Sequence, residues 1–302
     1  MMSKSKIVVV DDFRKEFLDK LKEFGKVVKL TDITGYNQLD DVNILVVRSK
    51  TKVGKDLVDR MPSLKCVITA THGTDHVAVD YLKMKSIEFC NVAAQCYDVA
   101  QGVLAYILAK ATNLVDADRS IKKGEWKKKE LKGFRIKGKT LGVIGCGGIG
   151  REVVKMASAL EMNVIVYDPY VDMSDLNVSL DELLETSDFI TVHIPLTEKT
   201  RGLIGKNEIK KMKTGAYIIN TARGGIVDEE ALLSALNEGI ISGAALDVYK
   251  YQPPFKNEVS HKLIRNERVM ASPHSIGQTS EAVDEKGEGV IEIIRNFISR
   301  NN

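Results

Sequence analysis

The sequence has few cysteines, few prolines and no long apolar run. Four of its 302 residues are cysteine and six are proline. The cysteines form neither a CxxC pair nor a Cys/His cluster at metal-ligand spacing, so we expect reduced thiols and no metal site. No apolar stretch reaches the roughly 18 residues of a membrane span, and the N-terminus lacks a signal-peptide core. We therefore expect a cytoplasmic protein without a membrane partner.

An excess of charge of one sign is also missing. The sequence has 44 basic and 41 acidic side chains, for a formal net charge of +3, whereas chains that bind nucleic acid usually carry a clear basic excess. With 44% hydrophobic and 28% charged residues, the composition is typical of a globular protein. The length is large for a single core and favours two domains.

Short apolar runs alternate with helical patterns along almost the whole chain. Continuous apolar strands separated by helices are typical of parallel sheets that are covered on both faces. The predicted strands are 6–10, 44–47 and 67–69 in the first part, and 141–144, 164–167, 189–192, 217–219, 243–246 and 269–271 in the second. The pattern predicts an α/β protein with a Rossmann-type doubly wound sheet of about six strands and a smaller, flavodoxin-like α/β domain.

An apolar stretch, 99–115, predicts one long helix that crosses between the two parts. The lysine-rich segment 122–139 follows it. We interpret this segment as a solvated arm; contact with a partner subunit or an anionic substrate is the alternative.

A glycine-rich motif directly follows the strand predicted at 141–144 and precedes a helical pattern. It reads Gly145-Cys146-Gly147-Gly148-Ile149-Gly150. In a GxGxxG motif the first glycine permits a tight turn, the second lets a pyrophosphate approach the backbone, and the third allows close helix packing. The context favours a dinucleotide site over an ordinary glycine turn.

The next strand ends in Asp168, whose carboxylate can accept hydrogen bonds from the hydroxyls of an adenosine ribose. A carboxylate would repel the 2′-phosphate of NADP, and the adjoining Pro169 and Tyr170 offer no compensating cation. We therefore predict NAD as the cofactor. The alternative is a carboxylate that merely ends a strand.

Four later segments resemble one known family. They are Val192-His193-Ile194-Pro195-Leu196-Thr197 with Thr200-Arg201-Gly202, Ile219-Asn220-Thr221-Ala222-Arg223-Gly224-Gly225-Ile226-Val227-Asp228, Gly243-Ala244-Ala245-Leu246-Asp247-Val248, and Ser272-Pro273-His274-Ser275-Ile276-Gly277. On the basis of these segments, the chain resembles the D-isomer-specific 2-hydroxyacid dehydrogenases. The resemblance extends over essentially the full length of the chain. It looks like the phosphoglycerate dehydrogenases and the glyoxylate and hydroxypyruvate reductases, without a C-terminal regulatory domain. The resemblance implies a homodimer that moves a hydride between NAD and a small D-2-hydroxy acid.

Two residues fit the chemistry of that reaction. Reduction of a 2-oxo acid creates negative charge on the oxygen at C2, beside a carboxylate, so the site needs a fixed cation and a proton donor. Arg223 offers a planar guanidinium with several donors, and by resemblance it is the substrate arginine. His274 matches the histidine of the Pro-His signature of the family, which implies that it exchanges the proton.

The resemblance also assigns cofactor contacts. Asp247 matches the aspartate at the nicotinamide carboxamide. His193 resembles a structural residue of a cofactor-covering loop, although a second acid is the alternative. The remaining residues expected to line the cofactor are Ile194, Pro195, Thr200, Thr221, Ala222 and Gly277.

One position departs from the family. Relatives usually place a glutamate before the proline that follows the aspartate, where its charge keeps the catalytic histidine protonated, but this chain has Gln252 before Pro253. A neutral amide can orient an imidazole but cannot raise its pKa by charge pairing.

The formate dehydrogenase branch resembles this chain in its Gln–His pair, so formate oxidation is an alternative. We rank it lower because the extra N-terminal segment of that branch is not seen. A non-catalytic, NAD-sensing corepressor is a third possibility, against which the retained Arg223 and His274 argue.

The first part of the chain carries the substrate candidates. Arg48 lies in a segment that resembles the one placing an arginine near the substrate phosphate of phosphoglycerate dehydrogenases, although a surface arginine is nearly as good an explanation. Thr71, His72 and Gly73 lie where the family offers backbone N–H groups to the substrate carboxylate. Thr69 stands where phosphoglycerate enzymes often carry a second arginine, and Gln95 stands where the family usually has an asparagine. Both departures weaken an assignment to phosphoglycerate, so 3-phosphoglycerate, hydroxypyruvate and glyoxylate are all kept as candidate substrates.

The last predicted helix, 278–298, should return to the first part of the chain. We therefore predict a discontinuous substrate-binding domain at 1–97 and 276–302, and an NAD-binding Rossmann domain at 98–275.

Overall fold

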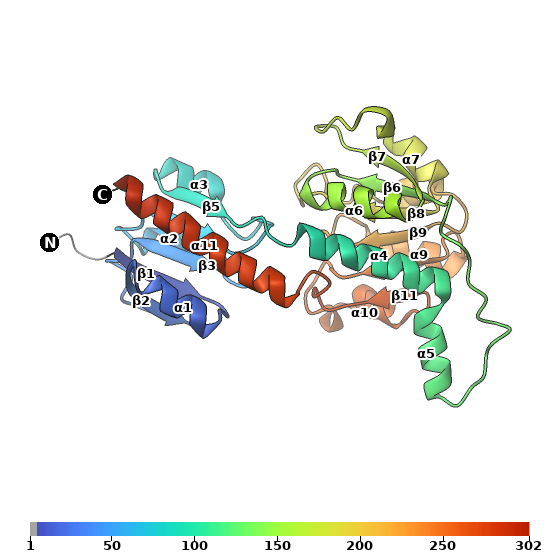
Figure 1. The fold of residues 1–302 in the computed structure, drawn as a ribbon, viewed down its shortest axis with the longest axis horizontal. Helices are drawn as coiled ribbons and strands as arrows, with labels where there is room; N and C mark the ends of the chain where they lie inside the picture. Colours follow the sequence, from blue (N-terminus) through green and yellow to red (C-terminus); the bar gives the residue numbers. More distant parts are fainter. Residues whose placement is uncertain (1–4, 302) are drawn as a thin grey trace. The chain divides into compact units, whose positions relative to one another are not determined.

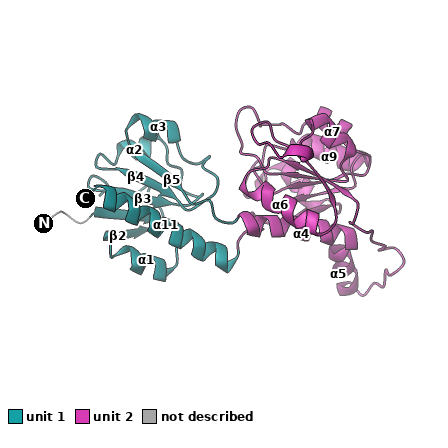
Figure 2. Cartoon of the chain, turned by 45° about the horizontal axis from the view of Figure 1, so that its top comes forward, with its two compact units in different colours: residues 1–95, 279–302 teal, residues 96–278 magenta. Residues whose placement is uncertain are grey.

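The computed structural model describes residues 5–301. Two compact units divide the chain: unit 1 is Met1–Gln95 with Thr279–Asn302, and unit 2 is Cys96–Gln278 (Figure 2). The boundaries expected from the sequence, after 97 and before 276, lie close to these. Within the described range, no helix is both long enough and apolar enough to cross a membrane.

Unit 1 contains a five-stranded sheet in which all neighbouring strands are parallel. The strand order is β2-β1-β3-β4-β5, which is the flavodoxin-like order. All residues of β3 and β4 are buried because helices cover both faces, and for this reason these strands appear in the sequence as unbroken apolar runs. The strands are β1 (Ser5–Val10), β2 (Gly25–Leu30), β3 (Ile44–Val47), β4 (Cys66–Thr69) and β5 (Glu88–Asn91).

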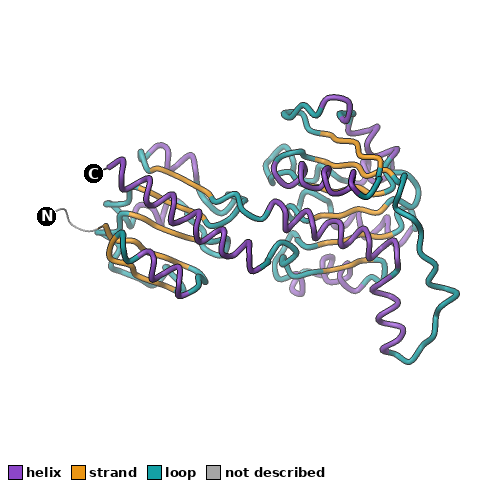
Figure 3. The backbone as a smooth tube through the Cα atoms, in the orientation of Figure 1, coloured by secondary structure: helices purple, strands orange, loops and turns teal. Residues whose placement is uncertain are grey.

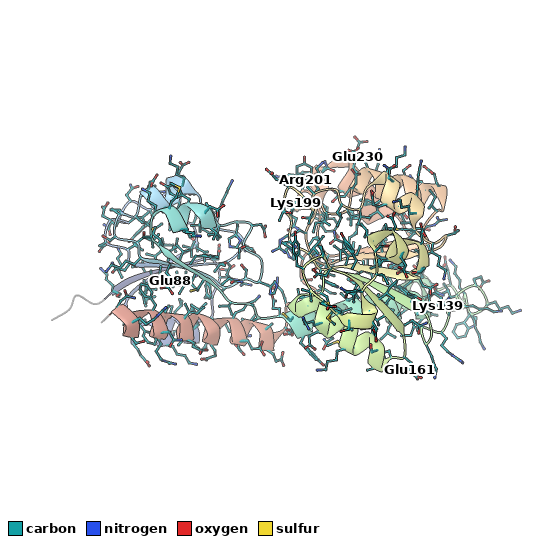
Figure 4. All side chains as sticks on the ribbon, turned by 90° about the horizontal axis from the view of Figure 1, so that it is seen from above. Glu88, Lys139, Glu161, Lys199, Arg201 and Glu230 are labelled. Carbon is teal, nitrogen blue, oxygen red and sulfur yellow. The ribbon has the colours of Figure 1, made fainter. Side chains whose placement is uncertain are left out.

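Four helices cover this sheet, two on each face (Figure 1). They are α1 (Lys15–Leu21), α2 (Lys55–Asp59), α3 (Val79–Met84) and α11 (Ser280–Asn301). α1 and α11 share one apolar core, whereas α2 and α3 contribute to the other. Arg300 near the end of α11 donates to Glu88 of β5 at 2.6 Å (Glu88 is labelled in Figure 4). The C-terminal helix is therefore an integral part of unit 1.

Unit 2 contains a parallel sheet of six strands, which confirms the predicted Rossmann-type sheet. Its order is β11-β10-β9-β8-β6-β7, so the direction in which strands are added reverses between β6 and β8. In open parallel sheets ligands bind beside the carboxyl ends of the strands at such a reversal. The strands are β6 (Thr140–Ile144), β7 (Asn163–Tyr167), β8 (Phe189–Val192), β9 (Tyr217–Asn220), β10 (Gly243–Leu246) and β11 (Val269–Ala271).

Helices cover both faces of this second sheet. α4 (Cys96–Thr112) and α6 (Gly148–Ala159) pack on each other and on one face. The helices on the other face are α7 (Leu180–Thr186), α8 (Lys206–Lys211), α9 (Glu229–Glu238) and α10 (Glu258–Arg265). Two short 3-10 turns, η1 (Ser174–Leu176) and η2 (Pro254–Lys256), complete the unit. Each unit therefore contains a parallel sheet with helices on both faces.

The expected long helix at 99–115 is broken. α4 ends at Thr112, and a second helix, α5 (Leu114–Lys122), begins after Asn113. Asn113 has a φ of 51°, and its side-chain amide donates to the carbonyl of Lys132 at 3.0 Å. Asparagine adopts this left-handed conformation more readily than most residues. A long loop follows α5 and leads to β6 (Figure 3).

Candidate active site

The glycine motif forms the turn between β6 and α6, at the reversal point of unit 2. Gly145 has a φ of +91°, and a Cβ there would lie 2.5 Å from the Ile194 side chain. A Cβ on Gly150 would lie 2.2 Å from the carbonyl oxygen of Gly145. A Cβ on Gly147, by contrast, would meet no atom within 4 Å. The first and last glycines are therefore required by packing, whereas the middle one leaves open space beside the N-terminus of α6.

Asp168, which follows β7, is tied to this turn. One carboxylate oxygen, Oδ2, accepts from the N–H of Cys146 at 2.8 Å, and Oδ1 accepts from the N–H groups of Tyr170 at 2.9 Å and Val171 at 3.1 Å. The side chain is partly exposed. Because each carboxylate oxygen can accept two hydrogen bonds, Oδ2 retains capacity for a ligand hydroxyl. The aspartate is thereby fixed beside the glycine turn.

The loop after β8 is held together by Thr200. Its hydroxyl donates to the carbonyl of Pro195 at 2.6 Å and accepts from the N–H of Thr197 at 2.8 Å. Figure 4 labels Lys199 and Arg201, the neighbours of Thr200, on the same side of unit 2 as Glu230. The loop is then joined to the loop after β9, because the N–H of Gly202 donates to the carbonyl of Gly225 at 2.8 Å.

His193, at the start of this loop, is neutral. Its Nε2 lies 2.9 Å from the Thr191 hydroxyl, and burial lowers the pKa of His193 to about 3. An imidazole with so low a pKa is not in its acidic imidazolium form near neutral pH, which favours the structural interpretation of His193.

Two buried polar atoms at this edge of the sheet have no hydrogen-bond partner among residues 5–301. They are Nδ1 of His193 and Oγ1 of Thr221. β8 and β9 are neighbours, with Val192 paired to Asn220, so the two residues follow adjacent strand ends. Buried polar atoms are normally satisfied, and a bound polar ligand would satisfy these. The residues present therefore fit a dinucleotide at the carboxyl edge of the sheet.

Asn220, at the end of β9, shapes the backbone that carries Arg223. Its amide oxygen accepts from the N–H of Ala222 at 3.1 Å, and its amide nitrogen donates to the carbonyl of Arg223 at 3.0 Å. A Cβ on Gly224 would lie 1.9 Å from the carbonyl oxygen of Tyr249. The arginine loop therefore packs directly against the segment that leads to Gln252.

Gln252 and His274 are in contact. The Gln252 amide oxygen lies 3.2 Å from Nδ1 of His274, and both side chains are exposed. Because a carbonyl oxygen only accepts, this contact places a proton on Nδ1 and leaves Nε2 as the atom that gains or loses a proton. The sequence identifies this pair, and the structure supplies its geometry.

Asp247 holds the backbone around His274. Its side chain is 2% exposed, and Oδ1 accepts from the N–H of Ser275 at 2.9 Å, the N–H of Ile276 at 3.3 Å and the hydroxyl of Ser272. The resemblance assigns this residue to the cofactor, and the contact with the histidine segment is an additional one. Gly277 has a packing role, since a Cβ there would lie 2.5 Å from the Val99 side chain of α4.

Unit 1 has its own reversal point, between β1 and β3, and a cavity of about 450 Å³ lies there. Arg48 and Ala70, at the carboxyl ends of β3 and β4, contribute to its lining, together with Lys286 of α11. The Arg48 guanidinium donates to the carbonyl of Asp12 at 3.1 Å.

The loop that follows Ala70 carries the other substrate candidates. The Thr71 hydroxyl donates to the carbonyl of Gly73 at 2.7 Å, and the carbonyl of His72 accepts from the side chain of Asn91 at 3.0 Å. All predicted substrate residues of this unit therefore lie at the carboxyl ends of β3 and β4.

Several residues of the site are not apparent from the sequence. Asp11 accepts from the N–H of Arg48 at 2.7 Å and so fixes the arginine backbone. Ser272 and Tyr106 support Asp247. The sequence could have indicated Ser272, because this residue directly precedes the Pro-His pair. It could not have indicated Tyr106, which lies in an otherwise apolar stretch. Among the residues that the structure describes, no group of three metal-ligating side chains occurs.

Comparison with known proteins shows which proteins this chain resembles. Residues 104–275 match the model of the D-isomer specific 2-hydroxyacid dehydrogenase NAD binding domain. A D-3-phosphoglycerate dehydrogenase of Methanocaldococcus jannaschii is 40% identical over an alignment of 304 positions, which covers 97% of this chain and 57% of the relative. A hydroxypyruvate reductase of Thermotoga maritima is 43% identical over 260 residues, 85% of each chain.

A solved structure shares the fold. The D-lactate dehydrogenase of Aquifex aeolicus, complexed with NAD and lactic acid, superposes with a TM-score of 0.89 at 29% identity, covering 97% of this chain and 95% of the other. The chain spans about half the length of the phosphoglycerate dehydrogenases that it matches.

Proposed function

Because the chain belongs to the family of D-isomer-specific 2-hydroxyacid dehydrogenases, we propose that it interconverts a small D-2-hydroxy acid and the corresponding 2-oxo acid with NAD. The observation that carries the proposal is the 3.2 Å contact between Gln252 and His274. The pair lies in loops at the same edge of the sheet as the Arg223 loop and the glycine turn. A proton-exchanging imidazole, a cation and a dinucleotide turn are what such a reaction needs.

Residues of unit 2 would hold the cofactor. The N–H groups at the start of α6 face the open space beside Gly147 and suit a pyrophosphate, and Oδ2 of Asp168 can accept from a ribose hydroxyl. When bound, NADH supplies the hydride that adds to C2 of a 2-oxo acid. The charge of Asp168 favours NAD over NADP.

In the reduction, Arg223 and His274 act on the substrate. The guanidinium of Arg223 pairs with the substrate carboxylate and stabilises the charge that develops on the C2 oxygen. Nε2 of His274 then gives its proton to that oxygen, which completes the hydroxyl group. Gln252 holds Nδ1 so that Nε2 keeps its orientation. In the oxidation, Nε2 takes the proton back.

The substrate is a small anion. Arg48 lines the cavity of unit 1, and the Thr71–Gly73 loop directly follows Ala70, which also lines it, so these residues would contact the substrate as well. A similar D-3-phosphoglycerate dehydrogenase and a similar hydroxypyruvate reductase suggest 3-phosphoglycerate and hydroxypyruvate as the first compounds to try. A solved glyoxylate reductase of similar fold adds glyoxylate.

A turnover screen tests this proposal. NADH oxidation is followed with hydroxypyruvate, glyoxylate, pyruvate and 3-phosphohydroxypyruvate, and NAD reduction with formate is measured in parallel. The formate arm is included because formate oxidation needs no proton exchange with a hydroxyl and is therefore compatible with a Gln–His pair. Turnover of a 2-oxo acid supports the proposal. Turnover of formate alone would replace it, and NADH binding without any turnover would favour a sensor protein.

We also propose a homodimer in the cytoplasm. All four cysteines are free, and α5 with the loop after it exposes apolar side chains that a partner subunit could cover. They are Leu114, Ile121, Trp126 and Phe134. Light scattering should give twice the 33.4 kDa chain mass, and Trp126→Lys combined with Ile121→Asp should yield a monomer. A monomeric wild-type protein would exclude this assembly.

A further inference from the structure

A chain of three side chains lies behind the His274 segment. Tyr106 of α4 has its hydroxyl oxygen 2.5 Å from the Ser272 hydroxyl oxygen, and the Ser272 hydroxyl in turn donates to Asp247. Asp247 then accepts from the N–H groups of the two residues that follow His274. The three side chains come from α4, the end of β11 and the end of β10, so the contact exists only in the folded unit.

The direction of these hydrogen bonds is fixed by chemistry. An ionised carboxylate only accepts, so the single Ser272 proton points to Asp247 and the Tyr106 hydroxyl must donate to Ser272. Burial raises the pKa of Tyr106 to about 12, which keeps the phenol protonated. Tyr106 is 8% exposed, and its neighbours on α4, Val103 and Ile107, are fully buried. A phenol in such surroundings is costly unless it donates.

The backbone conformation of His274 explains why these three hydrogen-bonded side chains are important for the site. His274 has a φ of 56°, and non-glycine residues keep such a conformation only where the surroundings enforce it. Asp247 binds the backbone after the histidine. Before it, the hydroxyl of Tyr249 donates to the carbonyls of Ser272 at 3.1 Å and Leu246 at 3.0 Å. Both sides of His274 are therefore held.

We propose that Tyr106, acting through Ser272 and Asp247, is a positioning residue for His274. The inference rests on the proposed role of His274 as the proton donor, and it does not depend on which 2-oxo acid is reduced. Without the phenol, the Ser272 hydroxyl loses the donor that fixes its rotation, and Asp247 loses a fixed partner. The His274 segment then leaves its productive conformation more often, which lowers kcat without altering the glycine turn.

Tyr106→Phe tests the proposal, with Tyr217→Phe as a matched control. Tyr217 is also a buried tyrosine of unit 2, but its hydroxyl donates to the carbonyl of Ala244 at 2.7 Å. We expect Tyr106→Phe to lower kcat about tenfold, the effect of one lost buried hydrogen bond, with an almost unchanged KM for NADH. Tyr217→Phe should leave kcat nearly unchanged. An equal loss of kcat in both variants, or a loss confined to KM, would overturn the proposal.

A double-mutant cycle asks whether Tyr106 acts through Ser272. In a Ser272→Ala background the further change Tyr106→Phe should not lower kcat again, because the link is already broken. Independent, multiplicative losses would refute the coupling.

A readout without turnover separates this inference from the proposed function. In protein labelled with 13C-histidine, the His274 signal is assigned by its loss in His274→Asn. Tyr106→Phe should shift or broaden that signal and Tyr217→Phe should not, even if no 2-oxo acid is reduced. An unchanged His274 signal in Tyr106→Phe would reject the positioning role.

Discussion

At the scale of single residues, the Gln252–His274 pair is the feature of the site that departs from the pattern expected by resemblance. The sequence shows that an amide replaces the usual carboxylate, and the structure shows that the amide oxygen still meets the imidazole at 3.2 Å. Orientation is therefore retained while charge pairing is lost. The consequence is that the side chain at position 252 orients His274 without supporting its protonation by charge.

Gln252→Glu should move the fall of activity to higher pH. A carboxylate beside the imidazole favours the imidazolium, so the pKa of His274 rises and the protonated donor persists to higher pH. An opposite charge in contact shifts a pKa by about one to three units. The measurement is kcat/KM for 2-oxo acid reduction from about pH 5 to 9 in both proteins, which reports the free enzyme. Superimposable profiles would mean that His274 is not the titrating donor.

Arg223→Lys should keep NADH binding and lose most turnover. Lysine retains the charge but not the planar set of donors that can hold a carboxylate and a ketone together. NADH affinity is read from fluorescence titration, and kcat/KM from steady-state rates. A lysine variant with near-normal kcat/KM would remove Arg223 from the substrate site. Its thermal melt must match that of the wild type, so that a folding defect is not mistaken for lost chemistry.

Asp168→Ala should narrow the preference for NAD over NADP. The wild-type chain should use NAD at least about tenfold more efficiently, because the carboxylate repels a 2′-phosphate. Removing the carboxylate relieves this repulsion without adding a partner for the phosphate. The ratio of kcat/KM for NADH and NADPH is the measured quantity. Equal use of both cofactors by the wild type would contradict the role of Asp168.

At the scale of elements, the turn between β6 and α6 contains two glycines that the packing of the fold requires and one that leaves open space for a ligand. The sequence predicts this turn well, because a left-handed backbone at Gly145 and a close contact at Gly150 leave few other residues possible. The same holds for the parallel strands, whose burial on both faces produces unbroken apolar runs.

Two glycines of that turn should respond differently to alanine. Gly150→Ala should destabilise unit 2, because its Cβ would lie 2.2 Å from a backbone oxygen. Gly147→Ala should melt like the wild type, since its Cβ would meet nothing within 4 Å and its φ is −72°, yet it should weaken NADH binding because the methyl group occupies the space beside α6. Thermal melts and NADH titrations compare the two. Unaltered NADH affinity in Gly147→Ala would place the pyrophosphate elsewhere.

Other elements could not be predicted. The apolar pattern of 99–115 continues across Asn113, and the break there depends on a hydrogen bond to the distant Lys132. Tyr106 and Ser272 are 166 positions apart along the chain, and no sequence pattern indicates that their side chains are in contact. Contacts of this kind depend on how strands are ordered in space, which a single sequence does not reveal.

At the scale of the whole molecule, two doubly wound sheets each place chemically useful residues at their carboxyl ends. Unit 2 supplies the glycine turn, Arg223, Gln252 and His274. Unit 1 supplies Arg48, which lines its cavity, and the Thr71–Gly73 loop, which follows the cavity residue Ala70. The succession of apolar runs predicts parallel sheets, and only the structure provides the strand orders that create the two reversal points.

The stereochemistry of the product tests the proposed reaction most directly. A 2-oxo acid that turns over is reduced in ordinary water with NADH carrying deuterium at both C4 positions, and the product is examined by mass spectrometry and chiral chromatography. The account predicts one deuterium at C2 and the D enantiomer of the 2-hydroxy acid. A product with the L configuration, or a product without deuterium at C2, would contradict it.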